Sequence, residues 1–201
     1  MVMMENPPIT KPSGTILERV EALRPVIEAG GHEAQKIRRL PTETVDAMID
    51  AGLFRAPSPK KLGGEDLSSM ETIEMLEAVS AIDASTGWNL MLGSEINAMV
   101  AGGMDPELAK EVYLDNPRVI MCGGGGPGTK PSYAKRDPNG DGYRVWGQAT
   151  FMSGCWNATW ALMTAPIVND DNTPTLDEHG KPTVKMWFMH RSQWEIVDTW
   201  D

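Results

Sequence analysis

Apolar residues recur at helical spacing through the first half of the chain. They lie three or four positions apart from Thr15 to about Arg38, which predicts a helix, and Pro25 predicts a kink within it. A second helix is predicted over residues 42–51, and Gly52 follows it at the position where a left-handed residue ends a helix.

Capping signals mark the start of three more helices. Ser68 and Glu71 have the spacing of a capping box, and an apolar helical pattern follows them. Asp83 predicts the N-cap of a fourth helix built from small and apolar residues. The pair Asp105–Pro106 predicts the start of a fifth helix, which ends near Leu114.

Beyond residue 117 the pattern changes to short strand-like runs separated by turn residues. Helices followed by strands predict an α+β chain. We expect a disordered leader over residues 1–14, an N-terminal α-helical domain over 15–116 and a β-barrel or sandwich domain over 117–201. The predicted strands are Val119–Cys122, Tyr143–Trp146, Trp160–Met163, Val184–Met189 and Trp194–Val197.

Composition narrows the classes of partner. With 201 residues and 41% hydrophobic content, the chain can bury a sizeable core. A formal net charge of -10 repels phosphate backbones and anionic lipid, so we expect neither nucleic acid nor membrane partners. No apolar stretch reaches the length of a membrane span and no secretory signal opens the chain, which predicts a soluble, cytoplasmic protein.

Several motif matches favour structural roles. The two cysteines and three histidines have no metal-ligand spacing, so no metal site is expected. Gly123, Gly125 and Gly128 fit a dinucleotide fingerprint, but Pro131 stands where the required helix would begin. Residues 137–142 resemble the opening of a calcium loop, yet their Asn-Gly and Asp-Gly pairs are more typical of a hairpin turn. Glu65 and Asp66 are interpreted as a solvated loop edge.

Residues 145–160 combine large aromatic side chains with a hydroxyl and a glycine. Ser153 offers a hydrogen-bond donor or acceptor, and Gly154 permits a close backbone approach. The aromatic residues are Trp146, Phe151, Trp156 and Trp160. Two interpretations stay open here: a pocket for a planar ligand, or a tryptophan-rich β-sandwich core. No pair of nucleophile and base is found, so the residues alone predict a ligand-binding α+β protein.

Beyond these patterns, the chain resembles the acyl-CoA dehydrogenase superfamily over about residues 15–201. The resemblance is carried by the five-helix order, the run Leu62–Gly64, and the motifs Ser85–Trp88 and Phe151–Cys155 with Ala158–Trp160. Within that superfamily it is most similar to the flavin-dependent hydroxylases, the oxygenase components of two-component aromatic and steroid-ring monooxygenases.

The resemblance implies a flavin site, for FAD or FMN. It places Phe151, Met152 and Ser153 against the flavin, with the Ser153 hydroxyl near ring nitrogen N5. It makes Trp88 a wall of the flavin and substrate pocket, and it places the loop Gly124, Gly125 and Gly126 under the flavin pyrimidine. Many hydroxylases have Trp-Ser where this chain has Phe151–Met152, which implies a substrate other than the familiar phenols.

The implied reaction is the transfer of one oxygen atom from O2 to a small aromatic or polycyclic substrate, with reduced flavin supplied by a separate reductase. The resemblance also implies a homotetramer. Family members are longer, and their C-terminal helical bundle supplies the catalytic base. We therefore expect an N-terminal fragment, with no catalytic residue assigned here. Two alternatives stay open: an acyl-CoA dehydrogenase that oxidises an acyl thioester, or a non-catalytic fragment.

Overall fold

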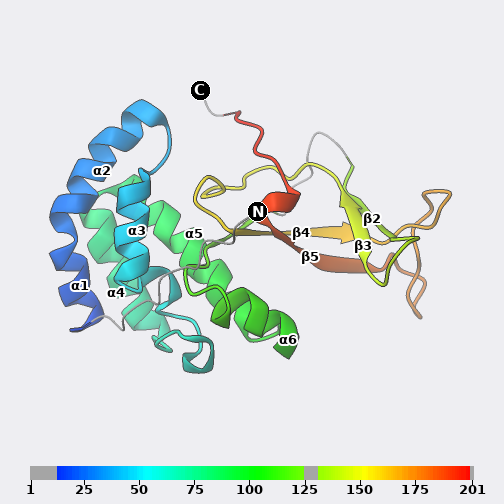
Figure 1. Cartoon of the computed structure of the whole chain (residues 1–201), viewed down its shortest axis with the longest axis horizontal. Coiled ribbons are helices and arrows are strands. Elements are labelled where there is room, and N and C mark those ends of the chain that lie inside the picture. Colours follow the sequence, from blue (N-terminus) through cyan, green and yellow to red (C-terminus); the bar gives the residue numbers. More distant parts are fainter. Residues whose placement is uncertain (1–12, 125–130, 200–201) are drawn as a thin grey trace. The chain divides into compact units, whose positions relative to one another are not determined.

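A computed structural model describes residues 13–124 and 131–199 of the chain. The chain forms two compact units, which we call the helical unit and the strand unit (Figure 1). Among the described residues, the helical unit comprises 13–121, 154–159 and 196–199. The strand unit comprises the described residues of 122–153 and 160–195. The predicted α+β class is confirmed.

Helices α1 to α5 lie side by side in the helical unit, and α4 and α5 are packed neighbours (Figure 1). None of the helices in the described ranges is long and apolar enough to cross a membrane. The α-helices are α1 (Ile16–Ala22), α2 (Arg24–Ile37), α3 (Thr42–Asp50), α4 (Ser69–Ile82), α5 (Ala84–Ala101) and α6 (Pro106–Ala109). The shorter turns are η1 (Leu53–Arg55), η2 (Lys60–Leu62) and the π-helical η3 (Lys110–Leu114).

The predicted N-caps are confirmed in the helical unit. The Ser68 hydroxyl accepts from the Glu71 backbone at 3.3 Å while the Glu71 carboxylate accepts from the Ser68 backbone at 2.8 Å. These reciprocal bonds satisfy two amide groups that a helix start otherwise leaves unpaired. Asp83 accepts from the Thr86 backbone at 2.7 Å, which fixes the first turn of α5.

The first predicted helix is in fact two helices. Leu23 ends α1 and Pro25 lies in the first turn of α2. Proline has no backbone N–H and is tolerated in a first turn, where that group has no helical partner. The chain therefore starts a new helix at this proline, so the prediction of a single kinked helix was wrong.

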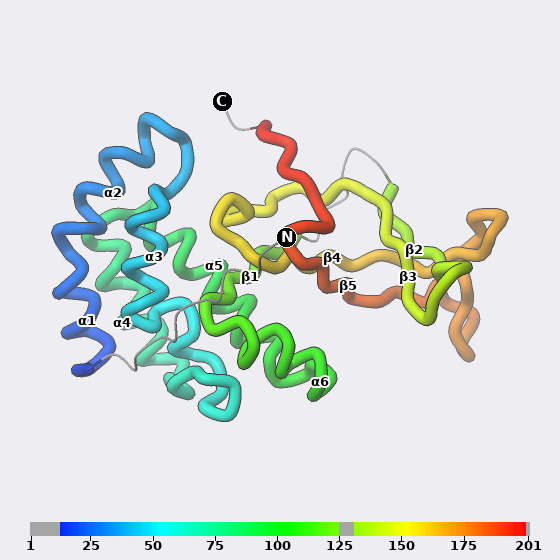
Figure 2. The backbone as a smooth tube through the Cα atoms, viewed as in Figure 1, coloured from blue at the N-terminus to red at the C-terminus, as the bar shows by residue number. Residues whose placement is uncertain are grey.

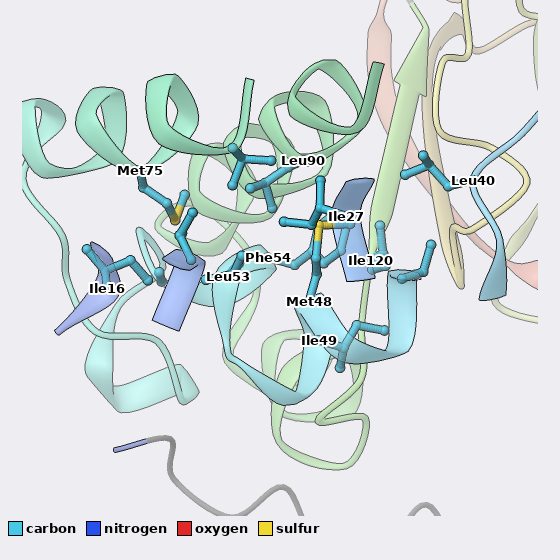
Figure 3. Packing of buried hydrophobic residues seen from close by; sticks show 14 residues of the cluster. Ile16, Ile27, Leu40, Met48, Ile49, Leu53, Phe54, Met75, Leu90 and Ile120 are labelled. Atoms are coloured by element: carbon cyan, nitrogen blue, oxygen red, sulfur yellow. The ribbon is translucent and has the colours of Figure 1, made fainter. Parts of the chain in front are cut away.

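Apolar side chains fill the space between the helices. Ile27, Met48 and Leu90 are fully buried, and they converge with Leu53 and Phe54 at the centre of the bundle (Figure 3). Helices α4 and α5 carry apolar residues around much of their circumference, but α4 leaves Met70 and Ile73 exposed. This core is the main source of stability of the helical unit.

An ion pair ties α1 to two loops. The Arg19 guanidinium, only 7% exposed, donates to both Glu65 carboxylate oxygens at 2.8 and 2.7 Å and to the Ala51 carbonyl at 2.7 Å. A bidentate geometry of this kind satisfies most donors of a buried guanidinium. Glu65 is therefore a structural partner of Arg19, and the interpretation of Glu65 as a solvated loop edge was wrong.

The strands form two open sheets rather than a closed barrel within the described residues. One sheet has the order β1-β4-β5, and the other pairs β2 with β3. The strands are β1 (Met121–Gly124), β2 (Tyr133–Arg136), β3 (Tyr143–Trp146), β4 (Trp160–Pro166) and β5 (Val184–His190). Strands β4 and β5 pair antiparallel, with Leu162 opposite Phe188.

The hairpin between β2 and β3 confirms the turn predicted over residues 137–142. Arg136 pairs with Tyr143, and the Asp137 amide donates to the Gly142 carbonyl at 2.9 Å. The sequence pattern missed β2, whose Tyr133–Arg136 run carries two charged residues. It also predicted a strand over residues 194–197, where the structure has no strand.

The connection between β4 and β5 makes two narrow excursions beyond the strand ends (Figure 2). Single bridges close them, Val168 to Pro174 and Leu176 to Pro182. The carboxylates of Asp171 and Asp177 accept backbone N–H groups at the two tips. The long connection is therefore ordered by local turn chemistry.

Candidate cofactor-binding site

The predicted site residues lie on three parts of the fold. Trp88 belongs to α5 in the helical unit, and Gly124 ends β1. Residues 151–153 lie in the connection between β3 and β4, in the strand unit. Gly125 and Gly126 fall outside the described residues.

Two of the predicted positions meet within the strand unit. A Cβ atom at Gly124 would lie 2.6 Å from the Thr150 carbonyl oxygen and 2.6 Å from the Met152 sulfur. Only glycine allows the end of β1 to approach the connection so closely. Gly124 and Met152 are thus neighbours, and Gly124 has a packing role that is independent of any ligand.

Phe151 has an unusual backbone conformation. Its φ is 58°, in the left-handed region that bulky residues rarely adopt, and its side chain is 80% exposed. This conformation costs about 1–2 kcal/mol for a residue with a Cβ atom. The strand unit therefore has a strained backbone at Phe151. The aromatic ring of this residue lies at the surface and buries little area.

The hydroxyl of Ser153 is available to a ligand. Ser153 is half-buried, and among the described residues no partner is found for its hydroxyl. A hydroxyl in this state can donate one hydrogen bond and accept others without breaking an existing contact. It follows Met152 directly, so the three residues combine a flat aromatic face, a flexible apolar side chain and a free polar group.

Trp88 projects from the N-terminal half of α5. Its indole is 54% exposed although α5 buries eight of its 18 residues, and the Asp83 cap fixes the start of the helix that carries it. The next residue, Asn89, donates its side-chain amide to the Ser85 carbonyl at 2.9 Å. The indole is therefore an exposed aromatic face on a well-anchored helix.

Residues 154–159, which we call the docked segment, pack on the helical unit. The sequence pattern suggested Gly154 and Trp156 for a ligand pocket but predicted no contact with the helices. The Arg39 guanidinium stacks over the Trp156 ring, 4.5 Å from its centroid. The Thr159 amide donates to the Ile120 carbonyl at 2.9 Å. No local pattern of hydrophobicity could have indicated these contacts. Arg39 lies more than a hundred positions from Trp156 in the sequence, and Ile120 lies about forty positions from Thr159.

The aromatic residues of 145–160 do not form one common core. Trp160 is 5% exposed and meets His190 edge-on, with ring centroids 5.4 Å apart. Trp146 is stacked on Tyr133, its cross-strand partner, at 5.3 Å. Phe151 and Trp156 remain exposed. The interpretation as a tryptophan-rich sandwich core therefore holds for Trp160 alone.

Within the described residues, no group of three His, Cys, Asp or Glu side chains could hold a metal ion. Burial raises the pKa of Tyr113 far above its usual value, against a smaller lowering by Arg55. The Tyr113 hydroxyl donates to the Asn97 carbonyl at 2.6 Å inside the helical core, so this shift has a structural cause.

One hollow of about 640 Å³ lies in the strand unit and contains none of the predicted site residues. Arg136 and Tyr143 line it on the β2–β3 hairpin, and residues 167–171 and Thr175 line it on the β4–β5 connection. It is open and largely polar, unlike the enclosed apolar pockets that hold planar ligands.

The amino-acid sequence matches a family model and a curated protein. Residues 19–114 match the family model "Acyl-CoA dehydrogenase, N-terminal domain". The oxygenase component of an FADH(2)-dependent resorcinol hydroxylase from Rhizobium sp. is 30% identical over 196 residues, which cover 97% of this chain and 44% of that protein. The chain therefore spans less than half the length of this relative.

Solved structures also match this chain over most of its length. XiaF from Streptomyces sp., in complex with FADH2 and glycerol, matches with a TM-score of 0.78 and 25% identity over 92% of this chain and 44% of that one. The HsaA monooxygenase from M. tuberculosis matches with a TM-score of 0.76 and 26% identity, covering 93% and 46%.

Proposed function

We propose that this chain, whose residues 19–114 match the acyl-CoA dehydrogenase N-terminal domain model, contributes the flavin-contacting N-terminal part of a monooxygenase oxygenase component. The observation that carries the proposal is the similarity to an oxygenase component along 97% of this chain, strand unit included. The family model alone ends before the strands begin.

The residues of the strand unit fit a flavin. An isoalloxazine ring needs a flat apolar neighbour and a polar contact at N5, and the exposed Phe151 ring and the free Ser153 hydroxyl offer these. The strain at Phe151 supports the proposal, because strained conformations persist where the surrounding structure and a function require them. Either FAD or FMN satisfies this chemistry.

Each proposed residue has a separate task. The Ser153 hydroxyl would hydrogen-bond the flavin, and the side chains of Phe151, Met152 and Trp88 would cover its ring with apolar surface. Bound reduced flavin supplies the O2-activating chemistry. Apolar cover keeps water and loose protons away from the ring, which limits wasteful release of peroxide. Gly124 would let the backbone of β1 approach closely.

The proposal extends to partners and substrate. The curated relative acts on resorcinol according to its name, so we propose a small aromatic or polycyclic substrate for this chain. A separate reductase would supply the reduced flavin, and the assembly would be a cytoplasmic homo-oligomer. The catalytic base is not assigned to any residue here.

A second candidate is favoured by the family match itself, since that family is named for acyl-CoA dehydrogenases. In that case the flavin would be oxidised at rest and would take electrons from an acyl thioester. The two candidate functions differ in the electron acceptor. A monooxygenase passes electrons from reduced flavin to O2, whereas a dehydrogenase passes them to a carrier protein.

The test is a flavin titration of the purified chain under anaerobic conditions, with FADH2 and FMNH2, followed by fluorescence and absorbance. We expect Ser153→Ala to weaken binding about fivefold, the effect of one hydrogen bond, and Ser153→Thr to retain it. Equal binding by wild type and Ser153→Ala would refute the role of Ser153. Absence of binding to either reduced flavin would refute the proposed function.

A further inference from the structure

The docked segment, residues 154–159, begins directly after Ser153. It belongs to the helical unit, although the residues before it and after it belong to the strand unit. Six residues of the connection are therefore held by helices and loops far away in the sequence. The position of the chain just after the Ser153 hydroxyl is set by these contacts.

The first contact lies at Gly154. Its φ is 79°, and a Cβ atom here would lie 3.6 Å from the Asn89 side-chain oxygen, so the segment starts against α5. Asn89 itself is held by its bond to the Ser85 carbonyl. The left-handed conformation at Gly154 directs the chain into the turn closed by the Asn157 amide and the Gly154 carbonyl at 3.0 Å.

The second contact is the stack of Arg39 on Trp156. The guanidinium lies 4.5 Å from the ring centroid, within the range of a cation–π interaction. The Trp156 indole is 42% exposed. Arg39 follows Arg38, the left-handed C-cap of α2, so a helix end sets the position of this cation.

The third contact is at Thr159. Its hydroxyl accepts from the Ile120 amide at 3.2 Å and lies 3.3 Å from the Ile120 carbonyl, to which the Thr159 amide also donates. Ile120 is 3% exposed and belongs to the helical core. One threonine thereby satisfies both backbone groups of a buried residue.

The run before β1 is held just as firmly within the helical unit. Arg55 donates to the Pro117 carbonyl at 2.9 Å, and the Asn97 amide donates to the Val119 carbonyl at 3.3 Å. Arg118 pairs with carboxylates of α3. Four consecutive residues, 117–120, are thus anchored before the chain enters β1. Thr159 joins the docked segment to this anchored run.

We propose that Thr159 and Trp156 are positioning residues for flavin binding: they hold the docked segment so that the Ser153 hydroxyl is presented in one fixed place. The inference rests on the proposed function, because it concerns the same hydroxyl. Neither residue needs to touch the flavin. If the segment were loosened, Ser153 would still be present, but its hydroxyl would occupy several positions. The affinity for flavin would then fall.

The experiment compares variants of the full 201-residue chain. Thr159→Val removes the hydroxyl at nearly constant volume, and Thr159→Ser restores it. Trp156→Ala removes the stack with Arg39. Because Trp156 is partly exposed, we expect the variant to fold. Ile27→Val is the control, because it loosens the helical core without touching the docked segment. Each variant is titrated with the reduced flavin that binds wild type, and its unfolding midpoint in urea is measured.

We expect Thr159→Val and Trp156→Ala to raise the flavin Kd about five- to tenfold and to shift the absorbance of the bound flavin toward that of free flavin. Thr159→Ser and Ile27→Val should retain the wild-type Kd and spectrum. Wild-type Kd in both Thr159→Val and Trp156→Ala, with Ser153→Ala still weakened, would overturn this inference alone. A loss in Ile27→Val equal to that in Thr159→Val would also overturn it, because general loosening would then explain the effect.

Discussion

The two units treat the same residue type in opposite ways. Phe54 in the helical unit is 2% exposed and packs in the core, whereas Phe151 in the strand unit is 80% exposed and strained. The helical unit buries Phe54 in its core, although other apolar side chains of that unit such as Leu17 and Met70 stay exposed, whereas the strand unit leaves Phe151 on its surface. At these two positions, one ring stabilises a core and the other is presented at the surface.

The largest loss of stability is expected from a substitution in the helical core. Leu53 is fully buried, so Leu53→Ala should lower the free energy of unfolding by about 2–5 kcal/mol, measured by urea denaturation. Leu17→Ala is the matched control, because Leu17 is 43% exposed and its loss should cost about 0.5 kcal/mol. Equal losses at both positions would contradict a packed helical core.

The Arg19–Glu65 pair is expected to have the next largest effect. Glu65→Gln leaves a buried guanidinium without its counter-charge and should cost about 2 kcal/mol in urea denaturation. Glu21→Gln in the exposed Glu21–Arg24 pair should change the unfolding midpoint very little. A cost at Glu65 no greater than at Glu21 would show that the buried pair contributes nothing to stability.

Tyr113 should give a smaller effect with its own pH dependence. Tyr113→Phe removes the bond to the Asn97 carbonyl and should cost about 1 kcal/mol at pH 7. Burial raises the pKa of Tyr113, so the wild type must lose stability above pH of about 10, where the unfolded phenol ionises and the folded one does not. Urea midpoints from pH 8 to 11 should fall less steeply in the variant, and parallel slopes would contradict this.

A substitution at Phe151 should change stability in the opposite direction. Phe151→Gly relieves the left-handed strain and loses little buried area, because the ring is 80% exposed, so stability should stay level or rise by up to about 1 kcal/mol. Flavin affinity should fall in the same variant, and Phe151→Tyr should keep it. A clear loss of stability in Phe151→Gly would mean that the ring packs within the protein and is not held for a ligand.

The smallest effect is expected at the α4 capping box. Hydrogen bonds from Ser68 lower the pKa of Glu71, so its contribution is present above the unfolded pKa and is lost as the pH falls through the lower folded value. The difference in urea midpoint between wild type and Glu71→Ala should therefore be larger at pH 7 than at pH 3. An equal difference at the two pH values would contradict the electrostatic explanation.

Local chemistry made three helix starts and one hairpin turn predictable from sequence. The caps at Ser68, Asp83 and Asp105 and the hairpin turn at 137–142 each depend on residues a few positions apart, and all are confirmed. The break at Pro25 was located correctly but interpreted as a kink. The strand β2 was missed because its pairing with β3, rather than its own composition, stabilises it.

The site was predictable only in part. The resemblance pointed to Phe151 and Ser153, but no sequence pattern indicates that Phe151 has a positive φ or that Ser153 has no partner among the described residues. The contacts of Arg39 with Trp156 and of Thr159 with Ile120 join distant segments, so local patterns contain no trace of them. The roles of Trp88, Gly124, Phe151, Met152 and Ser153 toward flavin all stay predictions.

The helical unit takes six of its residues from the middle of the strand sequence, so the chain is interleaved rather than arranged in tandem. A recombination event with one crossover near residue 121 would exchange the strands but also replace Trp156 and Thr159, leaving Arg39 and Ile120 opposite foreign residues. The two units are therefore constrained to be inherited together, and transplanting the strand sequence into another helical scaffold would require matching changes at both positions.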